Sequence, residues 1–251
     1  MIDLHTHLLP GVDDGARSMD VARAALRRLA ADGVTCVVCT PHVRASAAVA
    51  VPAALHQARL AELRAAVPDG PELRLGAEVM LDTPGADLRA AALRLGGADA
   101  VLVEFPRTGV PPRAARELAR LRESGLVPVV AHPERYWGCS VAHVREWRAA
   151  GAVMQGDATI ILGGGDRGRL ARVLLGAGLI DLLASDNHGD ARSLRPARDW
   201  LLELGAAEQA AQLTTRNAAH LLAGTPLEPV APVAVDPGML NRLRALLLGR
   251  A

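Results

Sequence analysis

Short apolar runs alternate with amphipathic segments along this chain, which predicts alternating strands and helices. Seven runs rich in Val, Leu and Ala have the pattern of buried strands, at residues 2–4, 34–39, 72–77, 98–103, 126–131, 152–156 and 179–184. Helical spacing of apolar residues predicts helices over 19–32, 52–67, 84–95, 112–124, 141–150 and 166–177, then closing helices over 194–204, 208–213 and 217–222. Because strands that alternate with helices pair in parallel, we expect an α/β fold with a seven-stranded, barrel-like sheet.

The end of the chain has a different pattern. Residues 225–237 are rich in proline and valine, which indicates an extended connector, and residues 239–248 have the spacing of a last amphipathic helix. We therefore expect one barrel domain over 1–224, and a connector with a C-terminal helix over 225–251 that packs on this domain or extends from it. Packing across the barrel bottom and contact with a partner are both open for this last segment.

Composition favours a single enzyme-sized domain. The 251 residues are half apolar, and their length suits one α/β barrel. A net charge of +1 gives no general attraction to nucleic acid or membranes, and aromatic residues, at 2 %, are too few for a base-stacking surface. We see neither a signal peptide nor an apolar run of about 20 residues that would span a membrane. We therefore expect a cytoplasmic protein without membrane insertion.

The three cysteines do not indicate thiol chemistry. Cys36 and Cys39 have C-x-x-C spacing, but they lie in a predicted strand, and no second pair completes a zinc site. Buried structural thiols are the better interpretation. None of the three, Cys139 included, stands in a glycine-rich loop with an arginine six residues on, as the loop of thiol-based phosphatases requires.

Metal-ligand residue types follow nearly every predicted strand. His5 and His7 are two residues apart at the end of the first run, so both imidazoles point to one side of an extended backbone. Active sites of barrel folds are built at the C-terminal ends of the strands. We therefore expect one multinuclear metal site made by His5, His7, Asp14, His42, Glu78, Glu104, His132, Asp186 and His188.

Each of these residues alone has a simpler explanation, such as a hydrogen-bonded histidine or a carboxylate in a salt bridge. Together they favour metal, because carboxylates at the mouth of an apolar barrel are costly without cations. Histidine and carboxylate ligands without thiolate suit Mn²⁺, Fe²⁺ or Zn²⁺. Nine ligands exceed the needs of one ion, so we expect two or three ions, with manganese preferred. Two neighbouring ions favour attack of an activated hydroxide on phosphorus.

With these residues in view, the chain resembles the PHP (polymerase and histidinol phosphatase) superfamily, and within it the bacterial metal-dependent tyrosine phosphatases of capsule and exopolysaccharide synthesis. The resemblance runs from residue 1 to about 192 and is carried by Met1-Ile-Asp-Leu-His-Thr-His, Leu9-Pro-Gly-Val-Asp-Asp-Gly, Thr40-Pro-His, Gly76-Ala-Glu, Glu104-Phe-Pro, Ala131-His-Pro-Glu-Arg-Tyr and Ser185-Asp-Asn-His. It implies a distorted (β/α)₇ barrel, the PHP fold, and gives the metal-ligand role to all nine residues above.

The resemblance also implies two arginines that bind the substrate phosphate, Arg135 and Arg192. An arginine three residues after a ligand histidine is well placed to hold a phosphoryl group in a bidentate way. A plain surface residue is the alternative for Arg192. The family is richer in tyrosine where this chain has Val79-Met80-Leu81, and its loop after the last histidine is longer. These differences affect the walls around a phenyl ring and leave the exact substrate open.

We predict a metal-dependent phosphomonoesterase, specifically a protein-tyrosine phosphatase, in which a metal-activated hydroxide attacks phosphorus and Arg135 and Arg192 neutralise charge. A phenolate leaving group, with a pKa near 10, needs little protonation, and Asp13 or a metal-bound water could supply the proton. The resemblance implies that the substrate is the phosphotyrosine tail of a bacterial tyrosine kinase that regulates polysaccharide export. The alternatives are a small-molecule phosphatase, such as one for histidinol phosphate, and a non-catalytic metal-stabilised regulatory domain.

Overall fold

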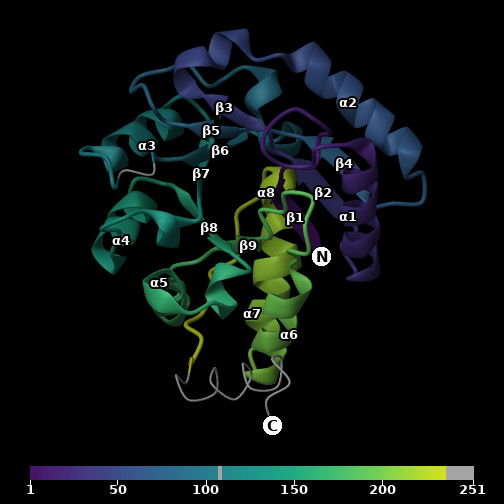
Figure 1. The fold of residues 1–251 in the computed structure, drawn as a ribbon. Helices are drawn as coiled ribbons and strands as arrows, with labels where there is room; N and C mark the ends of the chain where they lie inside the picture. The colour runs from purple at the N-terminus through teal and green to yellow at the C-terminus, as the bar shows by residue number, and fades with distance from the viewer. Residues whose placement is uncertain (107–108, 236–251) are drawn as a thin grey trace.

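The computed structural model describes residues 1–106 and 109–235, in which all strand pairs are parallel (Figure 1). One sheet has the order β1-β2-β4 and comprises β1 (Ile2–Thr6), β2 (Cys36–Cys39) and β4 (Glu72–Leu75). The other has the order β3-β5-β6-β7-β8-β9 and comprises β3 (His42–Arg44), β5 (Glu78–Met80), β6 (Ala100–Glu104), β7 (Val127–Ala131), β8 (Val153–Asp157) and β9 (Leu182–Ala184). An isolated parallel bridge between Thr6 and Asn187 joins them. The parallel α/β prediction is confirmed, and the closed barrel stays a prediction.

Two short strands, β3 and β5, were not predicted; each follows a predicted strand after a break in the chain. Pro41 has no N–H to continue the ladder of β2, and a Cβ atom on Gly76 would lie only 3.1–3.2 Å from Leu95. At each break the chain passes from the first sheet to the second. His42 and Glu78 therefore begin these two strands, and they pair side by side in the β3–β5 ladder.

Five helices lie outside the arc of strands in Figure 1: α1 (Met19–Ala31), α2 (Ala53–Ala66), α3 (Ala114–Glu123), α4 (Val141–Ala149) and α5 (Gly165–Gly176). The helix predicted over 84–95 is wrong. This segment holds only 3₁₀ turns at Ala91–Leu93 and Leu95–Gly97, because the Asp87 side chain accepts the Arg89 N–H at 3.0 Å and competes with helical bonding. His56 is buried because it shares the inner face of α2 with Leu60.

Three closing helices follow β9, and the last of them packs against the strands. They are α6 (Arg195–Glu203), α7 (Ala207–Ala211) and α8 (Asn217–Ala223), with a π-helical turn at Gln212–Arg216. Ala218 and Leu221 of α8 belong to the same apolar cluster as Leu4 of β1 and Leu182 of β9. Val230, in the extended segment after α8, is buried in the main core, and the helix expected over 239–248 lies outside the described residues. α8 lies inside the arc of strands and fills the space there with apolar side chains (Figure 1). A functional site can therefore form only at the end of the strands that α8 does not fill.

Candidate metal centre

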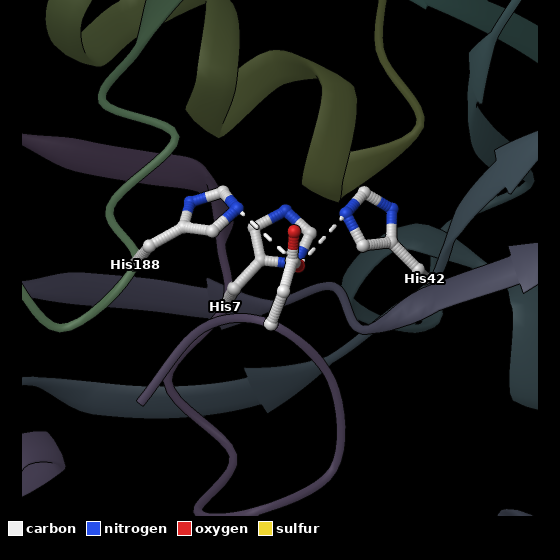
Figure 2. A group of neighbouring side chains, drawn as sticks. His7, His42 and His188 are labelled. Atoms are coloured by element: carbon white, nitrogen blue, oxygen red, sulfur yellow. Dashed lines mark ion pairs between the residues drawn. The ribbon is translucent and has the colours of Figure 1, made fainter. Parts of the chain in front are cut away.

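All nine residues predicted as metal ligands come together at the end of the strands opposite α8. They form four overlapping groups, in each of which the ligand atoms lie within 4.8 Å of one another. The groups are His7-Asp14-His42-His188, His5-Glu78-His132, His5-His7-Asp186 and His42-Glu78-Glu104. Figure 2 shows the rings of His7, His42 and His188 turned toward one another from separate elements. Because neighbouring groups share members, the nine residues make one continuous cluster.

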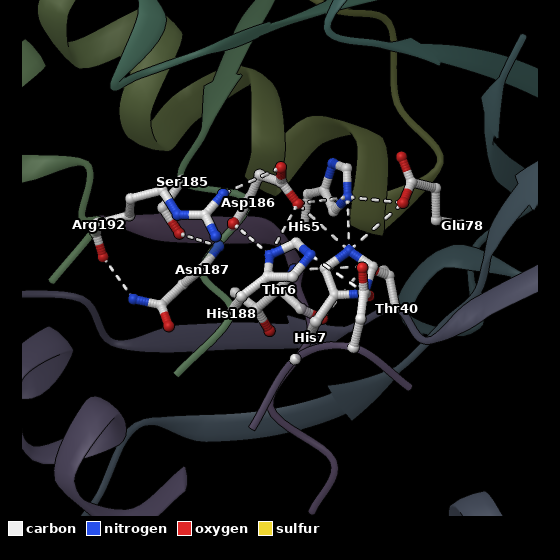
Figure 3. A network of polar contacts seen from close by, with 12 residues as sticks. His5, Thr6, His7, Thr40, Glu78, Ser185, Asp186, Asn187, His188 and Arg192 are labelled. Atoms are coloured by element: carbon white, nitrogen blue, oxygen red, sulfur yellow. Dashed lines mark hydrogen bonds and ion pairs between the residues drawn. The ribbon is translucent and has the colours of Figure 1, made fainter. Parts of the chain in front are cut away.

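His5 of β1 and His7, which directly follows it, each have one ring nitrogen bound by a side-chain oxygen outside the cluster. His5 Nδ1 lies 2.8 Å from Gln155 Oε1, and His7 Nδ1 lies 2.7 Å from Asp13 Oδ2. The opposite nitrogens, His5 Nε2 and His7 Nε2, are 3.1 Å apart in the centre of the cluster (Figure 3). Metal-binding histidines typically donate their outer N–H to an oxygen in this way and leave the inner nitrogen for the ion.

Two buried carboxylates face this pair of nitrogens. Asp186 Oδ1 lies 3.2 Å, and Glu78 Oε2 3.3 Å, from the Nε2 atoms of both His5 and His7. Burial acts to raise the pKa of Glu78, but the surrounding imidazoles outweigh it and hold the pKa well below its usual range. Burial also opposes ionisation of Asp186, yet His5 and Arg135 keep its pKa low. Both groups stay charged deep in the protein, where cations would stabilise them.

The backbone is strained at two of the predicted ligands. His132 has a φ of 35° and Asp186 a φ of 49°, in a region that residues other than glycine rarely adopt. Such conformations cost about 1–3 kcal/mol each and tend to mark functional sites. The His132 N–H donates to the Gln155 carbonyl at 2.7 Å, which helps to hold this conformation. Burial lowers the pKa of His132, and this favours the neutral imidazole that binds metals.

The loop between β1 and α1 places its two aspartates, Asp13 and Asp14, on different sides of the histidine rings. Asp13 lies behind the cluster, where its Oδ2 accepts His7 Nδ1–H and, at 3.2 Å, the His42 N–H. Asp14 faces the cluster, with Oδ1 3.3 Å from His42 Nε2. Gly15 lets the loop pass close by, because a Cβ atom there would lie 2.0 Å from the His7 carbonyl oxygen. Asp13 thus orients the His7 ring, whereas Asp14 is available as a ligand in the cluster.

A cavity of 330 Å³ opens beside the cluster and contains both predicted arginines. Its lining residues are Glu104, His132, Arg135, Tyr136, Asp157, Thr159, Ile160, Arg167 and Arg192. Arg135 forms ion pairs with Asp157 and Asp186, while Arg192 Nη1 lies 3.3 Å from Asp186 Oδ2. The Asn187 side chain donates to the Arg192 carbonyl at 2.5 Å, which closes the short loop after His188. One wall of the cavity is therefore cationic and shares a carboxylate with the metal-ligand cluster.

Four residues of this region were not among the predicted site residues. Gln155 and Asp157 lie in β8, at the strand ends where ligand-type residues were expected, so the same rule would have found them. Tyr136 stands in the H-P-E-R-Y segment, and its buried hydroxyl donates to the Ala131 carbonyl at 2.8 Å and accepts the Phe105 N–H at 3.1 Å. Arg167 had no signal in the sequence.

Comparison with known proteins agrees with this arrangement. Residues 1–223 match the family described as capsular polysaccharide synthesis, CpsB/CapC. The tyrosine-protein phosphatase YwqE of Bacillus subtilis (strain 168) is 34 % identical over 205 residues, which cover 75 % of this chain and 77 % of YwqE. The tyrosine-protein phosphatase CpsB of Streptococcus pneumoniae is 28 % identical over 140 residues, which cover 54 % and 58 %.

Solved structures show the same likeness. A crystal structure from work on YwqE and CpsB, described as unique metal-dependent tyrosine phosphatases, superposes with a TM-score of 0.81 at 25 % identity and covers 94 % of this chain and all of the other. The phosphotriesterase of Mycobacterium tuberculosis shares the fold alone, with a TM-score of 0.50 and 16 % identity over 81 % of this chain and 84 % of the other. In the described part of the chain, no helix has the length and apolar character needed to cross a membrane.

Proposed function

Because this chain belongs to the CpsB/CapC family of capsular polysaccharide synthesis, we propose that it is a metal-dependent protein-tyrosine phosphatase. The single observation that carries the proposal is the convergence of nine ligand-type side chains and two arginines on one cavity. The relatives named above supply the reaction, and the geometry supplies residues that would perform it on this chain.

The donor set fits divalent metal ions. It combines five imidazoles and four carboxylates without a thiolate, which suits Mn²⁺, Fe²⁺ or Zn²⁺, and we propose two or three ions with manganese preferred. His5, His7, Asp14, His42, Glu78, Glu104, His132, Asp186 and His188 would hold them. Ions bound there would supply an activated water for attack on phosphorus and positive charge for the phosphate oxygens.

The protein's own side chains would position the substrate. We assign Arg135 and Arg192 to the phosphoryl oxygens, because both guanidinium groups line the cavity next to the cluster. Asp157 and Asp186 engage Nη2 of Arg135, so Asp157 fixes the direction of this side chain. Asp13 accepts from His7 and from the backbone of His42, and we therefore assign it the orientation of His7 in preference to proton donation. A phenolate leaving group has little need of an acid.

The natural substrate follows from the family. We propose the phosphotyrosine tail of a bacterial tyrosine kinase that regulates capsular or exopolysaccharide synthesis. Such a tail is phosphorylated where ATP is present, so we place the enzyme in the cytoplasm. We further propose that the two parallel sheets belong to the distorted (β/α)₇ barrel of the PHP fold over residues 1–224, with residues 225–251 packed on or extending from it.

The test compares phosphate release from a phosphotyrosine peptide and from histidinol phosphate by metal-stripped protein resupplied with Mn²⁺. We expect a preference for the peptide, which His42→Ala abolishes together with bound metal measured by elemental analysis. His220→Ala serves as a control, since His220 lies on α8 and does not line the cavity. Preference for histidinol phosphate would move the chain to small-molecule metabolism, and metal binding without any phosphate release would indicate a regulatory domain.

A further inference from the structure

The cavity beside the metal cluster contains a third arginine, Arg167, whose situation differs from that of the other two. Arg135 and Arg192 have side chains only 22 % and 25 % exposed, and both form ion pairs with Asp186. Arg167 is exposed, and no carboxylate in the described part of the chain forms an ion pair with it. Its guanidinium therefore adds an uncompensated positive charge at the outer wall of the cavity.

The local structure fixes Arg167 in this place. Arg167 lies in the first turn of α5, after a loop that follows β8. Asp157, which forms an ion pair with Arg135, also accepts the N–H groups of Thr159 at 2.7 Å and Ile160 at 2.9 Å through Oδ1. These two hydrogen bonds fix the start of the loop. The backbone that presents Arg167 is thus anchored to the same carboxylate that orients the deeper arginine.

The end of the loop is also held. Arg172 donates from Nη1 to the carbonyls of Ile161 at 2.9 Å and Gly163 at 2.7 Å. Gly168 packs so closely on the loop that a Cβ atom there would lie 2.3 Å from the Gly163 carbonyl oxygen. A charge presented from a fixed backbone loses less entropy on binding than one on a mobile loop.

The exposure of its side chain separates the task of Arg167 from that of the other two arginines. The phosphoryl group belongs beside the buried cluster, where Arg135 and Arg192 contact Asp186. An exposed group at the outer wall meets the parts of a bound peptide that flank the phosphotyrosine. Guanidinium groups pair preferentially with carboxylates.

We infer that Arg167 is a specificity-determining residue that favours phosphotyrosine peptides with an acidic residue beside the phosphotyrosine. The inference rests on the proposed phosphatase function and adds the substrate class to it. Asp166, its neighbour in sequence, does not compete for this charge, because it pairs with Arg169 at 3.1 Å.

The experiment uses the full chain loaded with Mn²⁺ and three substrates. They are two phosphotyrosine peptides of equal length, one flanked by aspartate and glutamate and one by asparagine and glutamine, and p-nitrophenyl phosphate. For wild type, we expect kcat/KM to be about fivefold higher on the acidic peptide, the upper end for an exposed ion pair. Arg167→Gln should bring the two peptides close to equality, and its loss on p-nitrophenyl phosphate should be smaller than its loss on the acidic peptide.

Two further variants sharpen the result. Arg145→Gln is the control, because Arg145 is an exposed arginine of α4 that does not line the cavity, and we expect it to retain the acidic preference. Arg167→Glu should turn the preference toward a lysine-flanked peptide. A wild type that hydrolyses both peptides equally would overturn the inference, as would an equal loss on all three substrates in Arg167→Gln, which would place Arg167 on the phosphoryl group itself. Failure of wild type on every phosphotyrosine substrate would instead refute the proposed function.

Discussion

Replacing Tyr136 by phenylalanine tests how the cavity wall is held together. The Tyr136 hydroxyl is buried and joins two strand ends, donating to the Ala131 carbonyl of β7 and accepting the N–H of Phe105 just after β6. The predicted ligands Glu104 and His132 are the immediate neighbours of these two backbone groups. The hydroxyl therefore sets the spacing between two predicted ligands.

The expected magnitude follows from the two hydrogen bonds. Phenylalanine keeps the ring, which packs against Phe105 with a centroid distance of 5.3 Å and against Trp147 at 6.2 Å, so no cavity forms. It leaves one carbonyl and one N–H without the hydroxyl, and at about 1 kcal/mol per hydrogen bond the free energy of unfolding falls by about 2 kcal/mol. The Mn²⁺ concentration for half-maximal activity should rise, because the ends of β6 and β7 separate more easily.

Urea unfolding of the metal-free protein, followed by tryptophan fluorescence, measures the first quantity, and a Mn²⁺ activation curve measures the second. Thr214→Val is the matched control, since it removes a buried hydroxyl that donates to the Ala210 carbonyl at 2.7 Å, outside the cavity. It should cost about 1 kcal/mol and leave the Mn²⁺ requirement unchanged. A Tyr136→Phe protein as stable as wild type, with the same Mn²⁺ requirement, would refute the reasoning.

The remaining predictions concern the metal centre, the cavity and the two buried cysteines of β2. Mn²⁺ at about 100 times its dissociation constant should raise the free energy of unfolding by about 2.7 kcal/mol, which calorimetry with and without chelator would measure. Gly15→Ala should reduce this stabilisation, because the added Cβ atom would push the loop between β1 and α1 away from His7. Asp157→Asn should raise KM for p-nitrophenyl phosphate more than it lowers kcat, because Arg135 loses a charged partner; an unchanged KM would contradict this. Burial raises the pKa of Cys36 to about 11 and of Cys39 to about 12, so both thiols stay protonated at pH 8 and iodoacetamide should leave activity intact. These folded-state pKa values exceed the unfolded value of 9.0, so the unfolded chain loses its thiol protons first as the pH rises. The stability contributed by the two thiols is therefore fully present below about pH 9 and is lost as the pH rises toward 11–12. Unfolding curves measured at alkaline pH would show this loss.

Residue pattern and local chemistry determined the parallel α/β fold and most of its helices. The N-terminus of α1 was placed correctly because Ser18 caps it, with its side chain accepting the Val21 N–H. The nine ligand-type residues were found because parallel strands have their C-terminal ends on one side, so residues that follow different strands come close together. The resemblance to PHP phosphatases then indicated the family, which the comparisons confirm.

Tertiary structure decided what depends on contacts between distant segments. At Pro41 and Gly76 the chain passes from one sheet to the other, and which sheet the next residues join depends on distant strands. The sequence therefore showed that His42 and Glu78 follow β2 and β4, but not that they begin β3 and β5. The burial of His56 depends on what the inner face of α2 packs against.

The sequence also did not show which role each side chain has within the site. Asp13 and Asp14 are adjacent and chemically identical, yet one holds His7 from behind and the other faces His42. Arg167 joins Arg135 in one cavity only because α5 packs beside the 3₁₀ turn Pro133–Arg135. Residue type and spacing predict which groups can bind a metal or a phosphate, whereas the direction in which each side chain points is set by the three-dimensional packing of its neighbours.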